Sequence, residues 1–190
     1  MSPTALVPIA DGSEEIEAVT IIDVLRRAGI AVTVASVMDR PEITASRGVR
    51  IVADRLISEV ADQDFDLIVL PGGMPGAEHL RDNPRLLDRL RGHDAAGRLL
   101  AAICAAPAVV LEHHGLVRGR AVTCHPGFFD QLPPATRRTD RVVLDQGLLT
   151  SRGPGTALEF ALAIVEQLHG ADARQRVAEP MLPPAMPATG

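Results

Sequence analysis

The sequence predicts an α/β protein in which a mostly parallel sheet is covered by helices on both faces. Two short segments, 67–70 and 99–103, are continuously apolar, and each runs into a turn that contains proline. Such runs are typical of strands that are buried on both faces. Helical patterns lie between the runs, and parallel strands need helical crossovers. Both observations favour a parallel sheet between two helical layers.

The amino-terminal part of the chain predicts a strand, a helix, a second strand and a hairpin. The first apolar run ends at Asp11-Gly12-Ser13, and the acidic residues behind it suit the first turn of a helix. A Ser-Arg-Gly turn further on separates two short β-like segments. The expected elements are a strand at 4–10, a helix from 14 to about 29, a strand at 30–37 and a hairpin within 42–53.

The remaining elements continue the alternation of strands and helices. Glycine stops and apolar residues at helical spacing mark the helices, and Thr156 and Glu159 have the spacing of a capping box. The expected elements are a strand at 66–70, a helix at 86–96, a strand at 99–103, a helix at 105–114, a hairpin at 141–151 and a helix from 156 to about 169.

One domain is expected over residues 1–170, with 171–190 as a short C-terminal extension. A chain of 190 residues can bury a single core of ordinary size. After Gly170 the sequence turns polar and then rich in proline. The end of the extension, beyond about residue 179, is therefore expected to be mobile.

The composition excludes several classes of function. The net charge is −5, the basic residues are arginines scattered along the chain, and phenylalanine supplies all four aromatic residues. Sequence-specific nucleic-acid binding is therefore not expected, because there is neither a concentrated basic face nor a set of stacking rings. The chain has no lysine, which excludes catalysis through a lysine Schiff base.

The cysteines and the apolar runs indicate a cytoplasmic protein without a membrane partner. The two cysteines give neither a disulfide framework nor zinc-ligand spacing, so a reducing compartment is expected. The first residues lack the pattern of a leader, and no apolar run approaches the length of a membrane span.

Cys104 is the first candidate for a catalytic side chain. It follows the apolar run 99–103 and precedes small residues that open a helix. A thiol at such a corner meets unpaired N–H groups and the positive end of a helix dipole, which favour the thiolate. Cys124 is expected to be a core residue, since adjacent side chains on an extended chain point in opposite directions.

Two further features fall at neighbouring strand ends. Glu17 shares a helix face with apolar residues, so burial would raise its pKa and let it exchange protons; alternatively, it only complements the helix dipole. The turn Pro71-Gly72-Gly73 exposes N–H groups that, with the N–H of Ala105, suit an oxyanion. The alternative is a loop that simply needs glycine geometry.

His125 is the candidate among the histidines. It stands at the expected end of an apolar segment and precedes Pro126-Gly127. A histidine near Cys104 could lower the thiol pKa and carry protons, although no acid is obviously placed to orient it. The other five histidines are expected at the surface, in or beside polar helical segments.

Five segments form a specific set, in register over about residues 4–170. They are Ala10-x-Gly12-Ser13-Glu14-Glu15-Ile16-Glu17, Leu70-Pro71-Gly72-Gly73, Ala102-Ile103-Cys104-Ala105-Ala106-Pro107, His125-Pro126 and Thr150-Ser151-Arg152-Gly153-Pro154-Gly155-Thr156. Together they resemble the ThiJ/PfpI superfamily, in the branch of the Parkinsonism-associated protein deglycase and bacterial YajL.

The resemblance implies a flavodoxin-like three-layer sandwich that forms a homodimer and uses no cofactor or metal. It implies Cys104 as nucleophile, Glu17 as its protonated carboxyl partner and His125 nearby. It assigns oxyanion or substrate binding to Gly72, Gly73, Ala105, Arg47 and Arg152, and the dimer interface to Glu14 and Arg27.

The implied function is a cysteine-dependent, glutathione-independent glyoxalase or deglycase. Members of this branch are described as converting methylglyoxal to lactate, and as reversing early glyoxal adducts on proteins and nucleotides. The alternative is a non-enzymatic oxidative-stress sensor or a redox-regulated holdase chaperone that uses the same cysteine. Ala105 stands where the protease branch has histidine, which argues against peptidase activity.

Overall fold

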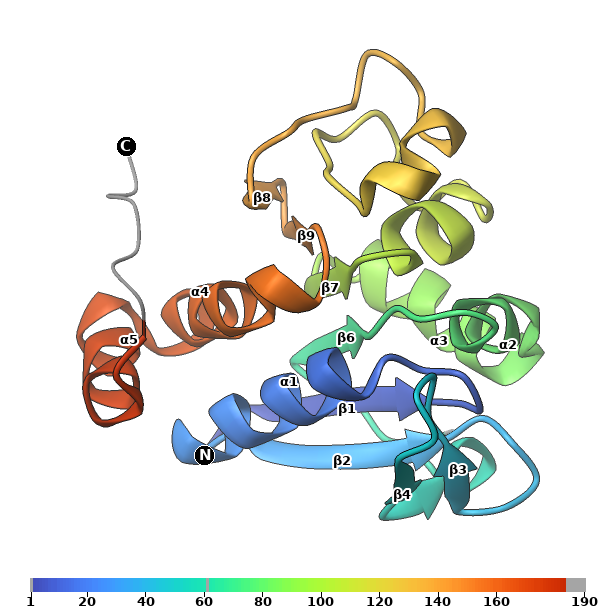
Figure 1. Cartoon of the computed structure of the whole chain (residues 1–190), viewed down its shortest axis with the longest axis horizontal. Helices are drawn as coiled ribbons and strands as arrows, with labels where there is room; N and C mark the ends of the chain where they lie inside the picture. The colour runs from blue at the N-terminus through green and yellow to red at the C-terminus, as the bar shows by residue number, and fades with distance from the viewer. Residues whose placement is uncertain (1, 61, 184–190) are drawn as a thin grey trace.

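Most strands of the main sheet are the apolar runs expected from the sequence. The computed structural model describes residues 2–60 and 62–183. The strands are β1 (Thr4–Ile9), β2 (Ala31–Ser36), β5 (Arg55–Leu56), β6 (Leu67–Leu70), β7 (Leu99–Ile103), β8 (Val142–Asp145) and β9 (Leu148–Ser151). They lie in the order β5-β2-β1-β6-β7-β9-β8 (Figure 1). Among these strands only β8 and β9 pair antiparallel, so the mostly parallel sheet is confirmed.

The register brings the carboxyl ends of β6, β7 and β9 together. Ala102 in β7 lies opposite Leu70 of β6 and opposite Thr150 of β9. The loops that leave these three ends therefore meet at one edge of the sheet. In doubly wound sheets this edge is the usual position of a binding site.

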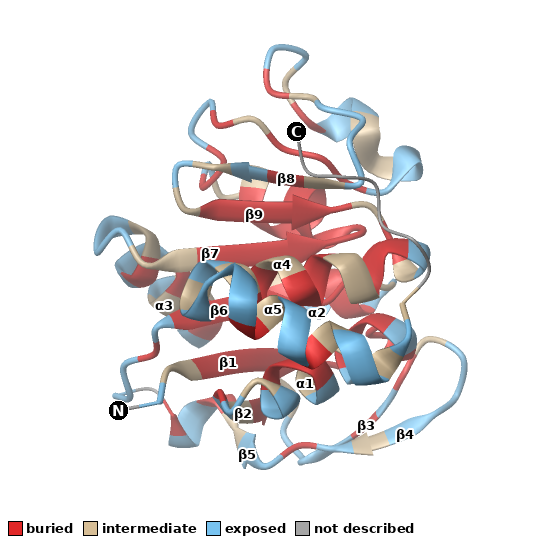
Figure 2. Ribbon diagram, turned by 90° about the vertical axis from the view of Figure 1, so that its left-hand side faces the viewer, coloured by how far each residue is buried: buried red, intermediate tan, exposed pale blue. Residues whose placement is uncertain are grey.

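Helices cover both faces of the sheet. One layer contains α1 (Glu15–Arg27), α4 (Ala157–His169) and α5 (Ala171–Ala178), and the other contains α2 (Gly76–Asp82), α3 (Pro84–Ala95) and a π-type helix at Pro107–Glu112. Alternate strand residues serve the two cores: Val7 belongs to the first and Leu6 to the second. Figure 2 shows the central strands buried between the layers. The flavodoxin-like three-layer sandwich is confirmed.

The predicted hairpin forms a separate antiparallel pair, β3 (Glu42–Thr44) and β4 (Arg50–Val52). Backbone hydrogen bonds tie it to the loop before α1. The Gly12 N–H donates to Thr44 O at 2.8 Å, and the Ser46 N–H donates to Ser13 O at 2.8 Å. The turn of the hairpin is thereby held beside the start of α1.

Three local expectations are wrong. The helix expected at 105–114 is confined to the π-type segment, and the segment before His125 contributes only an isolated bridge between Val122 and Arg137. No capping box forms, because the Thr156 hydroxyl hydrogen-bonds Ser151 Oγ and Gly153, while Glu159 pairs with Arg141. Thr156 and Glu159 each have another hydrogen-bond or ion-pair partner, so their spacing alone does not decide the structure there.

The helices α2 and α5 were not expected from the sequence. Ala173 and Val177 of α5 are buried in the same core as α1 and α4. The first part of the expected extension is thus packed on the domain. The mobility expected beyond about residue 179 falls largely on residues 184–190, which lie outside the described residues, while Glu179–Met181 form a short 3-10 helix. Within the described part of the chain, no helix is both long and apolar enough to cross a membrane.

Candidate functional site

Cys104 occupies a strained corner directly after β7. Its φ of 64° lies in the left-handed region, which costs a residue with a side chain roughly 1–2 kcal/mol. Two backbone bonds hold the corner: the Cys104 N–H donates to Ser151 O at 3.0 Å, and Cys104 O accepts from the His125 N–H at 2.8 Å. The loops after β7 and β9 and the segment around His125 therefore fix the thiol together.

Glu17 lies beneath the thiol. Its side chain is fully buried on α1, and its Oε2 accepts a hydrogen bond from the Gly72 N–H at 2.8 Å. A Cβ on Gly72 would lie 2.6 Å from Cys104 Cβ and 3.0 Å from Glu17 Oε2. The missing side chain at Gly72 is thus what lets the carboxyl and the thiol approach each other, as the turn after β6 suggested.

The pKa values of Glu17 and Cys104 agree with the expectation for the carboxyl but not for the thiol. Burial raises the pKa of Glu17 to about 7, against the hydrogen bonds from Gly72 and Cys104. Burial and the charge of Glu17 raise the pKa of the Cys104 thiol to about 12, although the N–H groups of Gly73 and Ala105 lower it. The direction of the shift at Glu17 agrees with the expectation, whereas the thiol pKa is raised and not lowered, first by burial and then by the charge of Glu17.

Burial is the largest cause of both raised pKa values, and the charge of Glu17 adds to the rise at the thiol. The N–H groups of Gly73 and Ala105 favour a negative charge on the sulfur. Glu17 Oε1 is buried and has no hydrogen-bond partner among the described residues, so it can take the thiol proton.

A cavity of about 260 Å³ opens above the sulfur. It is lined by Glu14, Ser46, Arg47, Gly73, Met74, Cys104, Ala105, His125, Phe128 and Pro154. Cys104 itself is 8% exposed, so access to the sulfur is through this opening. The cavity can hold a small molecule against the thiol and the two N–H groups.

His125 lies at the mouth of this cavity. Its ring is exposed, and Nδ1 accepts a hydrogen bond from the Gly127 N–H at 3.1 Å. In the neutral ring that bond places the remaining hydrogen on Nε2. The partner that orients the ring is thus a backbone group and not a carboxylate.

The structure brings only some of the expected charged residues to the cavity. Arg47 lines it, with its guanidinium donating to Ser46 O at 3.2 Å, and Glu14 lines it as well. Arg152 donates to Thr139 O at 3.0 Å and is not a lining residue. Arg27 pairs with Asp23 on its own helix at 2.7 Å. Arg152, expected to bind substrate, therefore lies apart from the lining, and Arg27, expected at a dimer interface, lies exposed on α1.

Four lining residues were not found from the sequence: Ser46, Met74, Phe128 and Pro154. Met74 lies in a loop, and Phe128 and Pro154 lie in short 3-10 helices, which are too short to show a periodic pattern. Ser46 had a weak signal, since it opens the turn of the predicted hairpin. Its role depends on the long-range contact between that turn and α1.

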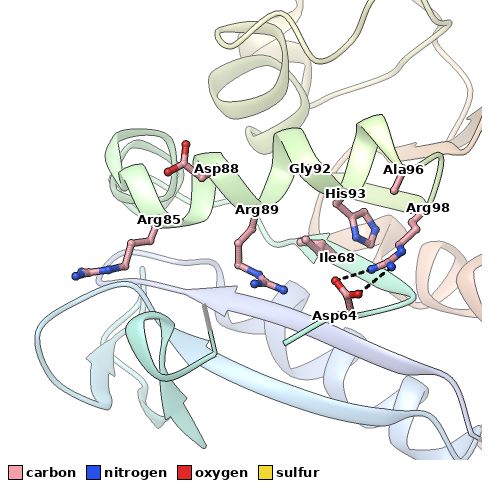
Figure 3. A pocket seen from close by; sticks show the side chains of 9 residues that line it. All are labelled: Asp64, Ile68, Arg85, Asp88, Arg89, Gly92, His93, Ala96 and Arg98. Atoms are coloured by element: carbon pink, nitrogen blue, oxygen red, sulfur yellow. Dashed lines mark hydrogen bonds and ion pairs between the residues drawn. The ribbon is translucent and has the colours of Figure 1, made fainter. Parts of the chain in front are cut away.

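A larger cavity of about 450 Å³ lies along α3, away from Cys104 (Figure 3). Asp64 and Arg98 pair across it at 3.0 Å, and no thiol lines it. His93, expected at the surface, is buried there, with Nε2 2.7 Å from Leu99 O. This cavity lacks the nucleophile and N–H groups of the smaller one, so the smaller cavity is the better candidate for a reactive site.

Glu17→Gln is expected to stabilise the protein at alkaline pH. The folded state raises the pKa of Glu17 from 4.5 to about 7, so folding binds a proton between these values. The contribution of the protonated Glu17 to the free energy of unfolding is fully present below pH 4.5 and is lost as the pH rises through 7. A neutral glutamine removes the penalty, which amounts to about 3 kcal/mol at pH 8. Urea unfolding at pH 5 and pH 8 measures it; equal differences at both pH values would contradict the prediction.

The fold and the cavity define an α/β protein with a cysteine at a sharp strand-to-helix corner, beside a buried carboxyl. The chain belongs to the DJ-1/PfpI family, whose sequence pattern matches residues 3–167.

Similar proteins cover most of the chain. It is 45% identical to protein dj-1beta of Drosophila melanogaster, over 96% of this chain and 98% of that protein. It is 39% identical to the glutathione-independent glyoxalase DJR-1.2 of Caenorhabditis elegans, over 95% of each. The structure of oxidized Toxoplasma gondii DJ-1 superposes with a TM-score of 0.94 at 49% identity, covering 95% of this chain and 98% of that one. The chain spans only 39% and 46% of the two Arabidopsis thaliana DJ-1 homologues, B and A.

Proposed function

We propose that this protein is a cysteine-dependent, glutathione-independent glyoxalase or deglycase. Its substrates are methylglyoxal, glyoxal or their early adducts with protein or nucleotide. The observation that carries the proposal is the Cys104 sulfur, which faces the N–H groups of Gly73 and Ala105 at the base of a small cavity. A relative that is 39% identical and named a glutathione-independent glyoxalase supports it.

The first step uses the residues around the sulfur. Cys104 passes its proton to Glu17, and the thiolate attacks the aldehyde carbon of the dicarbonyl. The carbonyl oxygen becomes an oxyanion, which the N–H groups of Gly73 and Ala105 stabilise by about 3 kcal/mol per donor. His125 at the mouth assists proton movement, and the resulting hemithioacetal goes on to a thioester that water hydrolyses to lactate.

Glyoxalase and deglycase action are separated by a rate titration. Early adducts dissociate spontaneously, so an enzyme that removes only free methylglyoxal pulls them apart no faster than that dissociation. A deglycase exceeds this ceiling as enzyme is added. Loss of a preformed adduct is measured against increasing native protein, with Cys104→Ser protein as the background.

Either rising or saturating adduct loss above that background supports a dicarbonyl-processing site, and the shape of the curve assigns the class. A native protein that neither consumes methylglyoxal nor accelerates adduct loss overturns the proposal. The measurement uses the full chain, so no separate folding assumption enters.

The rival function is an oxidation sensor or redox-regulated holdase. The N–H groups of Gly73 and Ala105 and a protonated Glu17 could hold a Cys104 sulfinate as well as an oxyanion. Mass spectrometry after mild peroxide tests this. A Cys104 that fails to gain two oxygen atoms removes the sensor, and unchanged client aggregation between reduced and oxidised protein removes the holdase.

We also propose a homodimer in the cytoplasm. Ile16 and Val19 of α1 are 55% and 50% exposed, and Val49 and Val52 of the neighbouring hairpin are 49% and 66% exposed. Exposed apolar side chains of this kind favour contact with another protein surface. A second copy of the chain is the partner that the resemblance implies.

A further inference from the structure

The carboxyl that lines the reactive cavity is that of Glu14. Glu17 is fully buried, is held on the Gly72 N–H and is not among the lining residues. It can exchange a proton with the sulfur beneath which it lies. A proton that must move between two carbon atoms of a bound substrate needs a base inside the cavity, within reach of those carbons.

Glu14 is anchored to the loop that stabilises the oxyanion. It stands at the N-cap of α1, and its N–H donates to Gly72 O at 3.0 Å. Its side chain makes no capping bond and instead lies 2.7 Å from Ser46 Oγ, through Oε2. The carboxyl is therefore directed away from the helix end and towards the hairpin turn that borders the cavity.

Ser46 links Glu14 to a second carboxylate. Its Oγ also lies 2.7 Å from Glu15 Oε2. A hydroxyl has one hydrogen, so it can donate to only one of the two carboxylates, and a proton on the other carboxyl completes both contacts. Although burial opposes it, hydrogen bonds from the backbone, Ser46 and Arg47 lower the pKa of Glu15. Glu15 is thus the acceptor of the Ser46 hydrogen, and the Glu14 carboxyl, at 2.7 Å from Ser46 Oγ, lines the cavity.

We propose that Glu14 is a second acid–base catalytic residue, which moves a proton between the two carbonyl-derived carbons of a dicarbonyl bound to Cys104. Ser46 is a positioning residue that holds its carboxyl. This inference rests on the proposed function and divides its proton transfers between two carboxyls. Glu17 exchanges a proton with the sulfur, and Glu14 moves a proton between the substrate carbons.

The step balances without an external oxidant or reductant. In the hemithioacetal, the Glu14 carboxylate takes the hydrogen of C1 as a proton, the C–H electron pair forms the C1=C2 bond, and the C2 carbonyl oxygen becomes an enediolate oxygen. The hydroxyl proton of C1 passes to the oxygen on C2. Glu14 returns its proton to C2 as the C1 oxygen re-forms a carbonyl, which gives a thioester. C1 is oxidised and C2 is reduced within one molecule.

The test compares Glu14→Gln with the native protein and with Glu78→Gln, a control carboxyl in the first turn of α2 that does not line the cavity. We measure lactate formation, the rate of iodoacetamide labelling of Cys104 across pH, and the mass of Cys104 after methylglyoxal treatment. The pH series is needed because the charge of Glu14 contributes to raising the pKa of Glu17. Glu14→Gln is expected to lower kcat for lactate about 100-fold or more, with adduct accumulating on Cys104. The control is expected to match the native protein.

A Glu14→Gln protein that forms lactate within threefold of the native rate overturns the inference. A parallel fall in labelling and lactate also overturns it, since Glu14 would then act only through the thiol. If the native protein makes no lactate, the proposed function itself is overturned. That outcome is distinct from a failure of the inference about Glu14, which needs an active native protein. Should Glu14→Gln not fold, Ser46→Ala provides the test: about a tenfold loss of kcat with unchanged labelling is expected, and an unchanged kcat overturns the inference.

Discussion

A Cys104→Ser protein is expected to consume methylglyoxal at least about 1,000-fold more slowly than the native chain. A serine hydroxyl at this corner is a far weaker nucleophile, because it ionises much less readily than a thiol. Glu17, whose pKa is raised to about 7, is too weak a base to ionise a serine hydroxyl. The chemistry that the cavity supports therefore depends on sulfur.

The measurement is the initial rate of methylglyoxal loss at matched protein concentrations. Near-ultraviolet circular dichroism of the variant shows whether the corner is still folded, since serine fits the space of cysteine. Cys124→Ser is the matched control, because Cys124 is fully buried and does not line the cavity. Retention of the native rate by folded Cys104→Ser protein would rule out the proposed mechanism.

Gly73→Ala is expected to destabilise the protein by more than about 4 kcal/mol and to abolish activity. Gly73 has a φ of +87°, and a Cβ there would overlap Glu14 N and Gly12 O. Both are backbone atoms that cannot move aside without displacing the loop before α1. The same displacement would withdraw the Gly73 N–H from the sulfur.

Gly48→Ala separates backbone strain from overlap. Gly48 has a φ of +86°, almost the same as Gly73, but nothing lies within 4 Å of its Cβ position. It should lose only the cost of the left-handed conformation, roughly 1–2 kcal/mol. Urea unfolding of both variants measures the difference. Equal losses would show that the crowding around Gly73 contributes nothing to stability.

The sheet was predictable because its strands are short apolar runs with clear boundaries. The run before Cys104 and the one before Pro71 each carry the pattern of a doubly buried strand. The helix α5 was missed because its sequence is polar, and only Ala173 and Val177 enter the core. The π-type segment after Cys104 was missed because its apolar residues also fit an ordinary helix.

The candidate site was predictable where a residue type is unusual in its surroundings. A carboxyl on an apolar helix face marked Glu17, and a glycine pair after a strand marked Gly72 and Gly73. The contact between Ser46 and Glu14 joins residues 32 positions apart, and no local pattern reports it. The thiol pKa was misjudged for the same reason, since burial and then the charge of Glu17 raise it by more than the local N–H groups lower it.

A backbone hydrogen bond from Cys104 to Ser151 helps to hold the thiol in place, so activity is expected only when both segments are folded. Cys104 directly follows β7, whereas Ser151 ends β9, which comes from the last third of the chain. Contacts between such distant segments form late and open early in local unfolding. Local opening of the β8–β9 hairpin would release the corner at Cys104 and inactivate the thiol, while most of the sheet stays folded. Loss of turnover should therefore precede global unfolding as denaturant is raised.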